Sequence, residues 1–354
     1  MIKVITLSQK EEWDFYVKNA FIHDFYHTWH YHTLDESGVA ILLVYEEDGD
    51  FIAFPCLKRK IPDSSFFDLS SVYGYVGPIA NKENQYLSEA LISNFKKAFL
   101  NFLKNEQIVS VFSRLHPFFD QDRLVSGFNG IYENGKTVAL DLTLPIVSQR
   151  KKYSSSTYRA IRKSWKRGFS IRETKQDADV NTFIDIYLEN MARINSTDYY
   201  LFSRQYFFDL INSNDFDCRL LLVSLKDEVV CGMIITFTHG IIQAHLVGTK
   251  EAYLIESPAK LLIDEITVLG RKEGMKYLHL GGGLGFREDT LFNWKSSFSD
   301  LFLDYKSFRH IVNDSVYQTL VQKQRIEKNA TIDFFPLYRA VAKVLAYNCF
   351  ELII

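Results

Sequence analysis

Residues 276–300, KYLHLGGGLGFREDTLFNWKSSFSD, contain a strand signal, a glycine-rich turn and a group of charged side chains. Residues 277–280 alternate as in a short strand, and the glycines after them free the backbone from the steric limits that a Cβ imposes. An acidic pair, Glu288 and Asp289, and one cation, Lys295, follow. A strand that ends in such a turn is a common way to present polar groups to a ligand. A tight loop with solvated charges is the alternative.

Two nucleotide-binding motifs are excluded in this stretch. A P-loop requires Gly-Lys-Ser/Thr after its glycines, and no such sequence follows Gly285. The dinucleotide pattern G-x-G-x-x-G fails because Phe286 occupies the place of the last glycine. The segment is therefore a glycine turn and not a recognised nucleotide loop.

The composition indicates a globular protein with two domains. The chain has 354 residues, of which 47% are hydrophobic and 24% charged, and one core rarely grows past roughly 250–300 residues. The net charge of −2 points to no class of partner, so charge has to be examined locally. The four cysteines lack a CxxC spacing and are expected to be reduced and buried. No signal-peptide pattern and no long uncharged apolar run are visible, so a cytoplasmic location without a transmembrane segment is expected.

One order of elements is expected twice along the chain. The first copy has a helix from residue 10, a hairpin over 39–45 and 51–58, a third strand, a helix over 85–104 and a strand over 108–115. Asp48-Gly49 is a strong hairpin-turn signal. The second copy has helices over 177–192 and 203–212, a hairpin over 218–225 and 229–237, a strand over 241–248, a helix over 258–273 and a strand from residue 277.

Two copies of one plan predict tandem domains. The expected fold class is α/β (mixed α+β), each domain being a mixed, largely antiparallel sheet flanked by helices. The expected limits are 1–145 for the N-terminal domain, 146–312 for the C-terminal domain with the donor and catalytic site, and 313–354 for a helical tail. The tail is apolar from Phe334 but interrupted by charges, so packing onto the domains is expected, with contact to a membrane surface as the alternative.

The stretch between the two copies carries the strongest charge bias. Residues 142–172 contain no Asp or Glu. They contain nine cations, namely Arg150, Lys151, Lys152, Arg159, Arg162, Lys163, Lys166, Arg167 and Arg172. Tyr158, Ile161 and Trp165 keep a helical spacing, which predicts one packed face and an outward cationic face. A solvated basic helix is one interpretation, and binding of phosphate groups is the favoured one.

A histidine-rich segment, FIHDFYHTWHYHTL, lies near the start of the chain. His23 and His27 have the i, i+4 spacing that can hold a metal ion, but no pattern supplies a third ligand. No metal site is expected, and an aromatic-rich core or pocket wall is the favoured interpretation.

With these stretches in place, the chain resembles the FemABX-like acyltransferases of the GNAT superfamily. The pieces that carry the resemblance occur in family order over roughly residues 25–300: FYHTWHYHTL, SVYGYVGP, VFSRLHP, GKTVALDLTL, STYRAIRKSWKRGFSI, YLENMARINSTDYYLFSRQYFFDL, ESPAKLLIDE and LHLGGGLGFREDTLFNWKSSFS. The resemblance implies two GNAT-like domains with a substrate cleft between them. It also implies transfer of an acyl or aminoacyl group to an amine, often on a cell-envelope precursor.

Two departures from the family leave the donor open. The chain has no long polar heptad segment like the coiled-coil arm of some members. It also lacks the acetyl-CoA loop Q/R-x-x-G-x-G/A at ESPAKLL. Acyl-CoA and aminoacyl-tRNA therefore both remain candidate donors.

The resemblance assigns the reaction centre to the glycine-turn segment. Lys295 matches the family's lysine, with Trp294 in place of the aromatic residue before it, and is expected to stabilise an oxyanion or a donor phosphate. A surface lysine is the alternative. Asp289 is the first candidate for a base or an amine-orienting carboxylate, and His279 is the second, with a buried core histidine as the alternative.

Substrate-binding residues are expected on both sides of the reaction. The helix that begins at Ser257–Pro258 offers backbone N–H groups to an anion, and the expected donor-binding residues are Ser257, Ala259, Lys260, Gly282 and Gly283. The resemblance implies that Arg193 and Tyr200 position the acceptor, with Arg193 binding a phosphate or carboxylate. The full set of expected acceptor-binding residues is Arg193, Tyr200, Tyr73, Tyr75, Arg159 and Arg162.

The expected function is transfer of an acyl group from acyl-CoA to an amine of a cell-envelope or polysaccharide precursor. No tightly bound cofactor is expected, and acyl-CoA is the co-substrate. An aminoacyl-tRNA-dependent peptidoglycan-precursor aminoacyltransferase, with tRNA as a partner, is the alternative. A second alternative is a non-catalytic nucleic-acid or anion-binding protein, although no known DNA or RNA module accompanies the basic helix.

Overall fold

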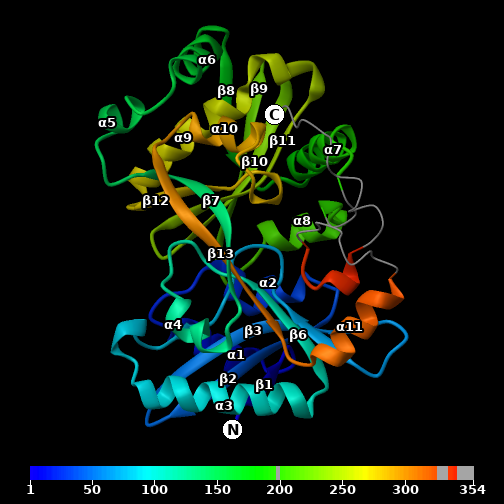
Figure 1. Ribbon diagram of the computed structural model, residues 1–354. Helices are drawn as coiled ribbons and strands as arrows, with labels where there is room; N and C mark the ends of the chain where they lie inside the picture. The colour runs from blue at the N-terminus through cyan, green and yellow to red at the C-terminus, as the bar shows by residue number, and fades with distance from the viewer. Residues whose placement is uncertain (197–199, 325–333, 341–354) are drawn as a thin grey trace. The chain divides into compact units, whose positions relative to one another are not determined.

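The computed structural model describes residues 1–196, 200–324 and 334–340 (Figure 1). Its contacts form two compact units, one comprising Met1–Asn134 and the described residues after Asp304, and the other comprising the described residues of Gly135–Asp304. Two long strands, β7 (Ile131–Asp141) and β13 (Leu301–Ile311), carry the chain from one unit to the other. The domains expected from the sequence, with limits at residues 145 and 312, are each one continuous stretch of chain, whereas the first contact unit combines two stretches. The expected limits stay a prediction.

The first unit contains the elements predicted for the first copy. Its strands are β1 (Lys3–Thr6), β2 (Val39–Glu47), β3 (Asp50–Lys60), β4 (Phe67–Ser70), β5 (Ile79–Ala80) and β6 (Ile108–Arg114). Its helices are α1 (Lys10–Lys18), α2 (Trp29–Thr33), α3 (Glu89–Asn105), α4 (Asp122–Val125) and α11 (Asp314–Lys323), with short 3-10 turns at Phe25–His27, Asn84–Tyr86, Ser126–Phe128 and Leu337–Arg339. The predicted hairpin is confirmed, and Asp48 and Gly49 turn it with φ of 53° and 82°.

The second unit contains the elements predicted for the second copy. Its strands are β8 (Phe169–Thr174), β9 (Asp217–Leu225), β10 (Glu228–Thr238), β11 (Ile241–Thr249) and β12 (Tyr277–Gly281). Its helices are α5 (Ile146–Arg150), α6 (Ser155–Lys166), α7 (Asp177–Arg193), α8 (Arg204–Ile211), α9 (Pro258–Lys272) and α10 (Thr290–Ser296), with 3-10 turns η5 (Glu251–Glu256) and η6 (Leu284–Phe286).

The sheets of the two units have the same strand order. The first runs β1-β2-β3-β4-β6-β13 and the second runs β8-β9-β10-β11-β12-β7. Each has one parallel pair, β4 with β6 and β11 with β12, among antiparallel pairs. The last strand of the first sheet is the end of β13, which pairs with β6. The last strand of the second sheet is the end of β7, which pairs with β12. The predicted fold class, tandem mixed sheets flanked by helices, is confirmed, whereas the exchange of these two strands is not visible in the sequence.

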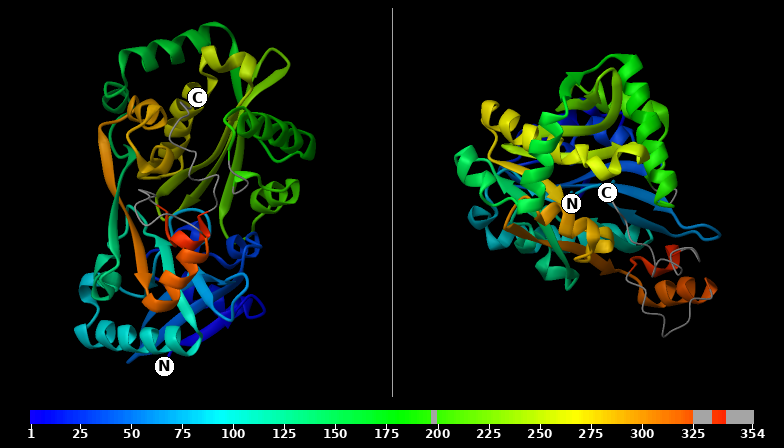
Figure 2. Two further views of the ribbon diagram at one scale, coloured as in Figure 1. Left: turned by 45° about the vertical axis from the view of Figure 1, so that its right-hand side comes forward. Right: turned by 90° about the horizontal axis from the view of Figure 1, so that it is seen from above.

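Helices cover both faces of the second sheet. In Figure 2 (left), α7 and α8 lie on one side of strands β9 to β11, and α9 lies on the other. Leu261, Leu262 and Ile266 of α9 have no exposed surface and pack on the face that carries Leu278 and Leu280 of β12. Burying each such side chain contributes about 1.5–3 kcal/mol, so this core holds β12, and with it the glycine turn, in place.

The histidine-rich segment belongs to the core of the first unit. His27 is fully buried, and its Nε2 lies 3.1 Å from the carbonyl oxygen of Val76. Within the described ranges no group of three or more His, Cys, Asp or Glu side chains could hold a metal ion. The described cysteines, Cys56, Cys218 and Cys231, are free and buried.

The start of the C-terminal segment packs on the first unit. Tyr338 donates to Asp68 at 3.0 Å, and Arg339 donates to the same carboxylate at 2.5 Å. The rest of the predicted helical tail, from residue 341, lies outside the described residues. In the part of the chain that the structure describes, no helix is long and apolar enough to cross a membrane.

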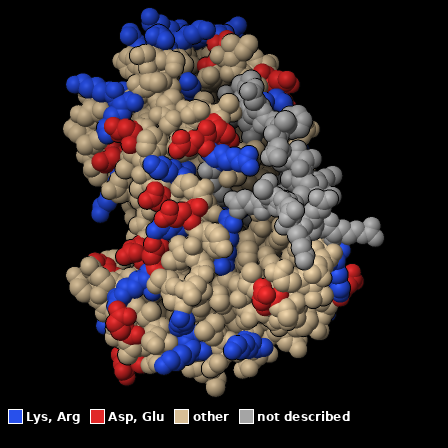
Figure 3. Space-filling view, in the orientation of Figure 1, with Lys and Arg blue, Asp and Glu red and all other residues tan. Residues whose placement is uncertain are grey.

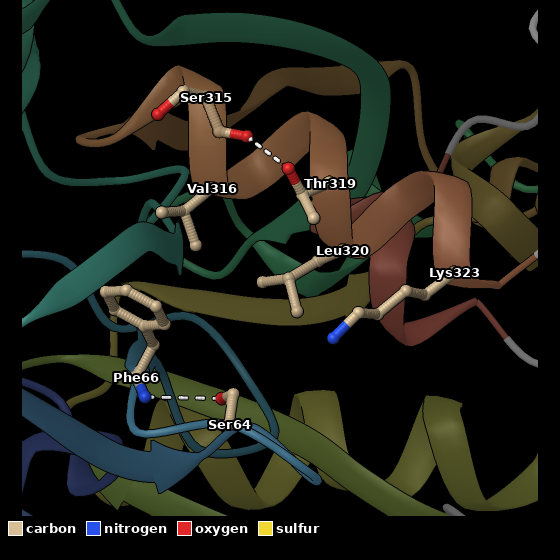
Figure 4. Close-up of a pocket in the computed structure, with 7 residues that line it drawn as sticks. All are labelled: Ser64, Phe66, Ser315, Val316, Thr319, Leu320 and Lys323. Carbon is tan, nitrogen blue, oxygen red and sulfur yellow. Dashed lines mark hydrogen bonds between the residues drawn. The ribbon is translucent and has the colours of Figure 1, made fainter.

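A shallow hollow of about 200 Å³ lies against α11 in the first unit (Figure 4). Phe66, Val316 and Leu320 form its apolar lining, and the ammonium of Lys323 lies at one end. None of the predicted site residues lines this hollow, so the candidate active site is located by the glycine turn instead.

Candidate active site

The second unit places two predicted features, the start of the donor helix and the glycine turn, at one edge of its sheet. The chain passes from β11 through η5 and α9 into the parallel strand β12, so the N-terminus of α9 and the glycine turn both follow carboxyl ends of strands. Ligands of open α/β sheets usually bind at this edge. The candidate active site is therefore built from the ends of β11 and β12, the start of α9 and the segment from Gly281 to Lys295.

The two parallel strands separate before β11 ends. Their pairing covers Ile241–Gln243 and Tyr277–His279, whereas β11 continues to Thr249. On the other side of β11, the register with β10 shifts by one residue at His245, which is a β-bulge. Bulges bend a strand and end regular pairing, and they are enriched beside active sites. The end of β11 thus has backbone groups that β12 does not pair.

Asp289 shapes the glycine turn. Its Oδ1 accepts the N–H of Phe292 and caps α10, while its Oδ2 accepts the N–H of Leu284, both at 2.8 Å. A Cβ on Gly283 would overlap Asp289 Oδ1 and the carbonyl oxygen of Arg287, so the turn requires glycine there. Because both carboxylate oxygens hold backbone N–H groups, we infer a positioning role for Asp289. The base role expected from the sequence stays an untested prediction.

Lys295 reaches back from the last turn of α10 to the glycine turn. Its Nζ donates to the carbonyl oxygen of Gly282 at 2.6 Å, and the side chain is partly buried. Removal from water lowers the pKa of the ammonium to about 8, and the charge of Asp289 partly offsets this shift. A dehydrated cation interacts more strongly with a developing negative charge than a solvated one does. The structure thus joins Lys295, Asp289, Gly282 and Gly283 in one cluster.

His279 lies inside the sheet rather than in the turn. It is 1% exposed, and its Nδ1 is 2.7 Å from Oε1 of Gln243 on the paired strand. Leu278 and Leu280 face α9, so strand alternation directs His279 to the opposite face. This environment fits the core-histidine alternative, and a catalytic role for His279 stays a prediction. Gln243 was not predicted as a partner, and its only signal in the sequence is a polar residue within the apolar strand IIQAHL.

The predicted donor residues begin α9. Pro258 occupies the first helical position, and Ser257 is the N-cap, as expected. Ser257 adopts a left-handed conformation with φ of 52°, and its hydroxyl donates to the carbonyl of Leu254 instead of capping the helix. Ala259 is buried, and partial burial of Lys260 lowers the pKa of its ammonium. The first turn is thus left without a side-chain cap from Ser257.

The comparisons with known proteins agree with this arrangement. Residues 151–296 match the family model described as an acetyltransferase (GNAT) domain. This segment is a GNAT acyltransferase domain. The match confirms the resemblance to the GNAT superfamily over this segment and supports the predicted acyltransferase activity. A search of curated proteins gives no match.

Solved structures share the fold of most of the chain. FemX is 13% identical, with 90% of this chain and 99% of FemX aligned at a TM-score of 0.70. L-PGS from Bacillus licheniformis is 13% identical, with 88% of this chain and 96% of the L-PGS chain aligned at a TM-score of 0.55. A protein of unknown function from Bacteroides thetaiotaomicron VPI-5482 is 11% identical, with 88% of this chain and 99% of that protein aligned at a TM-score of 0.55. The chain thus has a FemX-like fold that includes the GNAT domain.

The predicted acceptor residues are divided between the two units. In the GNAT domain, Arg193 ends α7 and donates to Oδ1 of Asn190 at 2.9 Å, and the carbonyl of Tyr200 accepts the hydroxyl of Tyr187 at 2.9 Å. The other two tyrosines belong to the first unit, where the Tyr73 ring lies 5.8 Å from the Arg114 guanidinium and the Tyr75 ring 5.5 Å from that of Tyr305. All four acceptor roles stay predictions.

The buried face of α6 differs from the predicted one. Thr157, Ile161 and Ser164 are buried, whereas Tyr158 and Trp165 are 44% and 46% exposed. Of the three residues in the predicted apolar stripe, only Ile161 packs inward. At 100° per residue, Tyr158 lies about 60° and Trp165 about 40° around the helix from Ile161, toward the exposed side. The predicted outward direction of Arg159 and Arg162 is confirmed, and neither contacts the Lys295 cluster.

A buried carboxylate that was not predicted connects α5 with α9. Asp264 is 3% exposed and accepts two hydrogen bonds from Arg150, at 2.9 and 2.7 Å, and one from Tyr153 at 3.0 Å. Bidentate pairs of this kind fix geometry as well as adding binding energy. The only sign of this interaction in the sequence is an acidic residue within the apolar run LLIDEIT. The partners of Asp264 could not be predicted, because they are distant along the chain.

Proposed function

We propose that the protein transfers an acyl group from acyl-CoA to an amine of a cell-envelope or polysaccharide precursor. The observation that carries the donor assignment is the separation of β11 from β12 beside the first turn of α9. An extended pantetheine arm with an amide backbone can pair with the unpaired end of β11. The pyrophosphate of the same donor suits the N-terminus of α9, where N–H groups and the helix dipole favour an anion.

The cluster around Lys295 supplies the reaction centre in this proposal. The amine nitrogen attacks the thioester carbonyl, a C–N bond forms, and the carbonyl oxygen becomes an oxyanion. Collapse of this intermediate breaks the C–S bond, and the CoA thiolate takes up the proton that the amine loses. The Lys295 ammonium, held at Gly282, stabilises the oxyanion, and a single such donor contributes about 3–4 kcal/mol.

Aminoacyl-tRNA is the second candidate donor. The segment before α9 is a 3-10 helix that contains Glu251 and Glu256 instead of a glycine-rich phosphate loop. The FemX-like fold over 90% of the chain also supports this candidate. An aminoacyl ester would react by the same addition at Lys295, with the ribose hydroxyl in place of the thiolate as leaving group.

Calorimetry with donor fragments tests the assignment. CoA and dephospho-CoA, which both contain the pyrophosphate, should bind with affinities within about tenfold of each other. Pantetheine, which lacks it, should bind on the order of 10²-fold more weakly, because it loses charge-assisted hydrogen bonds to the α9 N-terminus. No heat with CoA together with clear binding of tRNA would overturn acyl-CoA in favour of aminoacyl-tRNA.

A further inference from the structure

One surface of the GNAT domain has a concentration of cations that the reaction centre does not use. Arg159, Arg162 and Lys166 lie on the face of α6 opposite its buried residues, and all three are exposed. Figure 3 shows Lys and Arg gathered over α6 at the top of the view. The whole chain has a net charge of −2, so this is a local excess of positive charge. We call it, with the apolar side chains described next, the α6 surface.

Exposed apolar side chains lie on both flanks of these cations. On one flank are Tyr158 and Trp165, 44% and 46% exposed, which are seven residues apart and therefore nearly aligned along the helix. On the other flank Glu256 pairs with Lys163 and Arg167, which brings its neighbour Ile255 alongside α6. Ile255 is 94% exposed. Exposure of such a side chain to water is unfavourable, so a partner that buries it gains free energy.

Most of the positive charge on this surface is not neutralised by the protein. Glu256 pairs with Lys163 and Arg167, and Asp300 pairs with Lys152. Within the described ranges Arg159, Arg162 and Lys166 form no ion pair, and Arg162 lies over the Tyr158 ring with its guanidinium 5.9 Å from the centroid. Three cations thus remain available to a partner with several negative charges.

We propose that the α6 surface docks the protein on a bilayer that contains anionic lipids. Cations next to Trp and Tyr match the charged and interfacial layers of such a membrane. The protruding aliphatic Ile255 favours lipid over RNA, because an RNA surface offers phosphates and base planes but no hydrocarbon for it to enter. Docking through α6 goes beyond the transfer reaction, because it brings the GNAT domain to a membrane surface. In this proposal Arg159 and Arg162 bind lipid phosphates and do not bind the reacting amine.

Vesicle partition tests the charge requirement. The full chain should bind vesicles of phosphatidylcholine with phosphatidylglycerol, should not bind vesicles of phosphatidylcholine alone, and should bind less as salt rises. Each cation near an anionic membrane contributes about a fivefold gain in partition, so the triple variant Arg159→Gln/Arg162→Gln/Lys166→Gln should lose about 10²-fold. The control, Lys97→Gln/Lys104→Gln/Lys272→Gln, removes the same charge from exposed positions on α3 and α9 and should lose far less. Equal losses in the two triple variants would overturn the proposal.

The emission of Trp165 gives a second, local readout. On binding anionic vesicles the tryptophan emission should shift to shorter wavelength and be quenched by brominated lipid, and Trp165→Phe should remove that change. A shift that persists in Trp165→Phe would contradict docking through α6. Binding of tRNA that depends on Arg159, Arg162 and Lys166, without partition into anionic vesicles, would overturn the lipid assignment in favour of RNA. Circular dichroism of each variant checks that the fold is retained.

Discussion

Lys295→Met should lower the single-turnover rate of acyl transfer by about 10²–10³-fold, the loss typical of removing one oxyanion donor. Methionine keeps most of the aliphatic stem of the side chain but lacks the ammonium that donates to Gly282. Folding should survive, because the substitution removes a partly dehydrated charge and leaves no polar group of its own unpaired. The measurement is the rate with enzyme in excess over donor, once an amine acceptor is identified.

A matched lysine serves as the control for this variant. Lys272 is exposed at the end of α9, and Lys272→Met should leave the rate unchanged within about twofold, because exposed side chains away from the reaction contribute little. Circular dichroism and thermal unfolding report on the fold of both variants. A folded Lys295→Met protein that turns over at the wild-type rate would remove Lys295 from the mechanism.

Gly283→Ala should reduce turnover about as strongly, by on the order of 10²-fold, through displacement of the turn. The added Cβ overlaps the carbonyl oxygen of Arg287 and Oδ1 of Asp289, and the carboxylate cannot move without breaking the hydrogen bonds that it makes. The turn must open, which shifts the Gly282 carbonyl to which Lys295 is bound. Misplacement of a reacting group by about 1 Å can cost 10²-fold in rate.

Gly285→Ala is the matched control within the same turn. Gly285 has φ of +58°, and no atom lies within 4 Å of the position that an alanine Cβ would take, so alanine there is strained but meets no neighbour. That strain is expected to cost about 1–2 kcal/mol of stability, without displacing Asp289. Activity and thermal unfolding should therefore separate the two variants. Equal activity in Gly283→Ala and Gly285→Ala would show that the close packing at Gly283 is not needed for catalysis.

The sequence was most informative where local signals agree with the final packing. Asp48-Gly49 predicts its hairpin because a two-residue turn needs left-handed conformations, and both residues adopt them. Pro258 predicts the start of α9 for a similar reason, since its fixed φ suits the first helical turn. The repeated order of elements predicts two sheets of the same plan, and both sheets have the same strand order.

Features that depend on distant partners were not predictable in the same way. The Asp289 carboxylate looks like a candidate base in the sequence, and only the structure shows that both of its oxygens hold backbone N–H groups. Helical spacing places Tyr158 and Trp165 within reach of the packed face but cannot determine where that face ends. The exchange of β7 and β13 between the units depends on pairing across the chain, which no local pattern encodes.

The ratio of wild-type to Lys295→Met single-turnover rates, measured as a function of pH, tests the oxyanion role of the lysine most directly. The ionisation of the amine acceptor affects both proteins equally and cancels in the ratio. Burial lowers the pKa of Lys295 to about 8, so its stabilising charge is present below this pH and is lost as the pH rises through it. The ratio should be large and constant below about pH 8 and should fall about tenfold per pH unit above it. A ratio that stays constant across this pH, or that rises above it, would contradict a cationic Lys295 at the reaction centre.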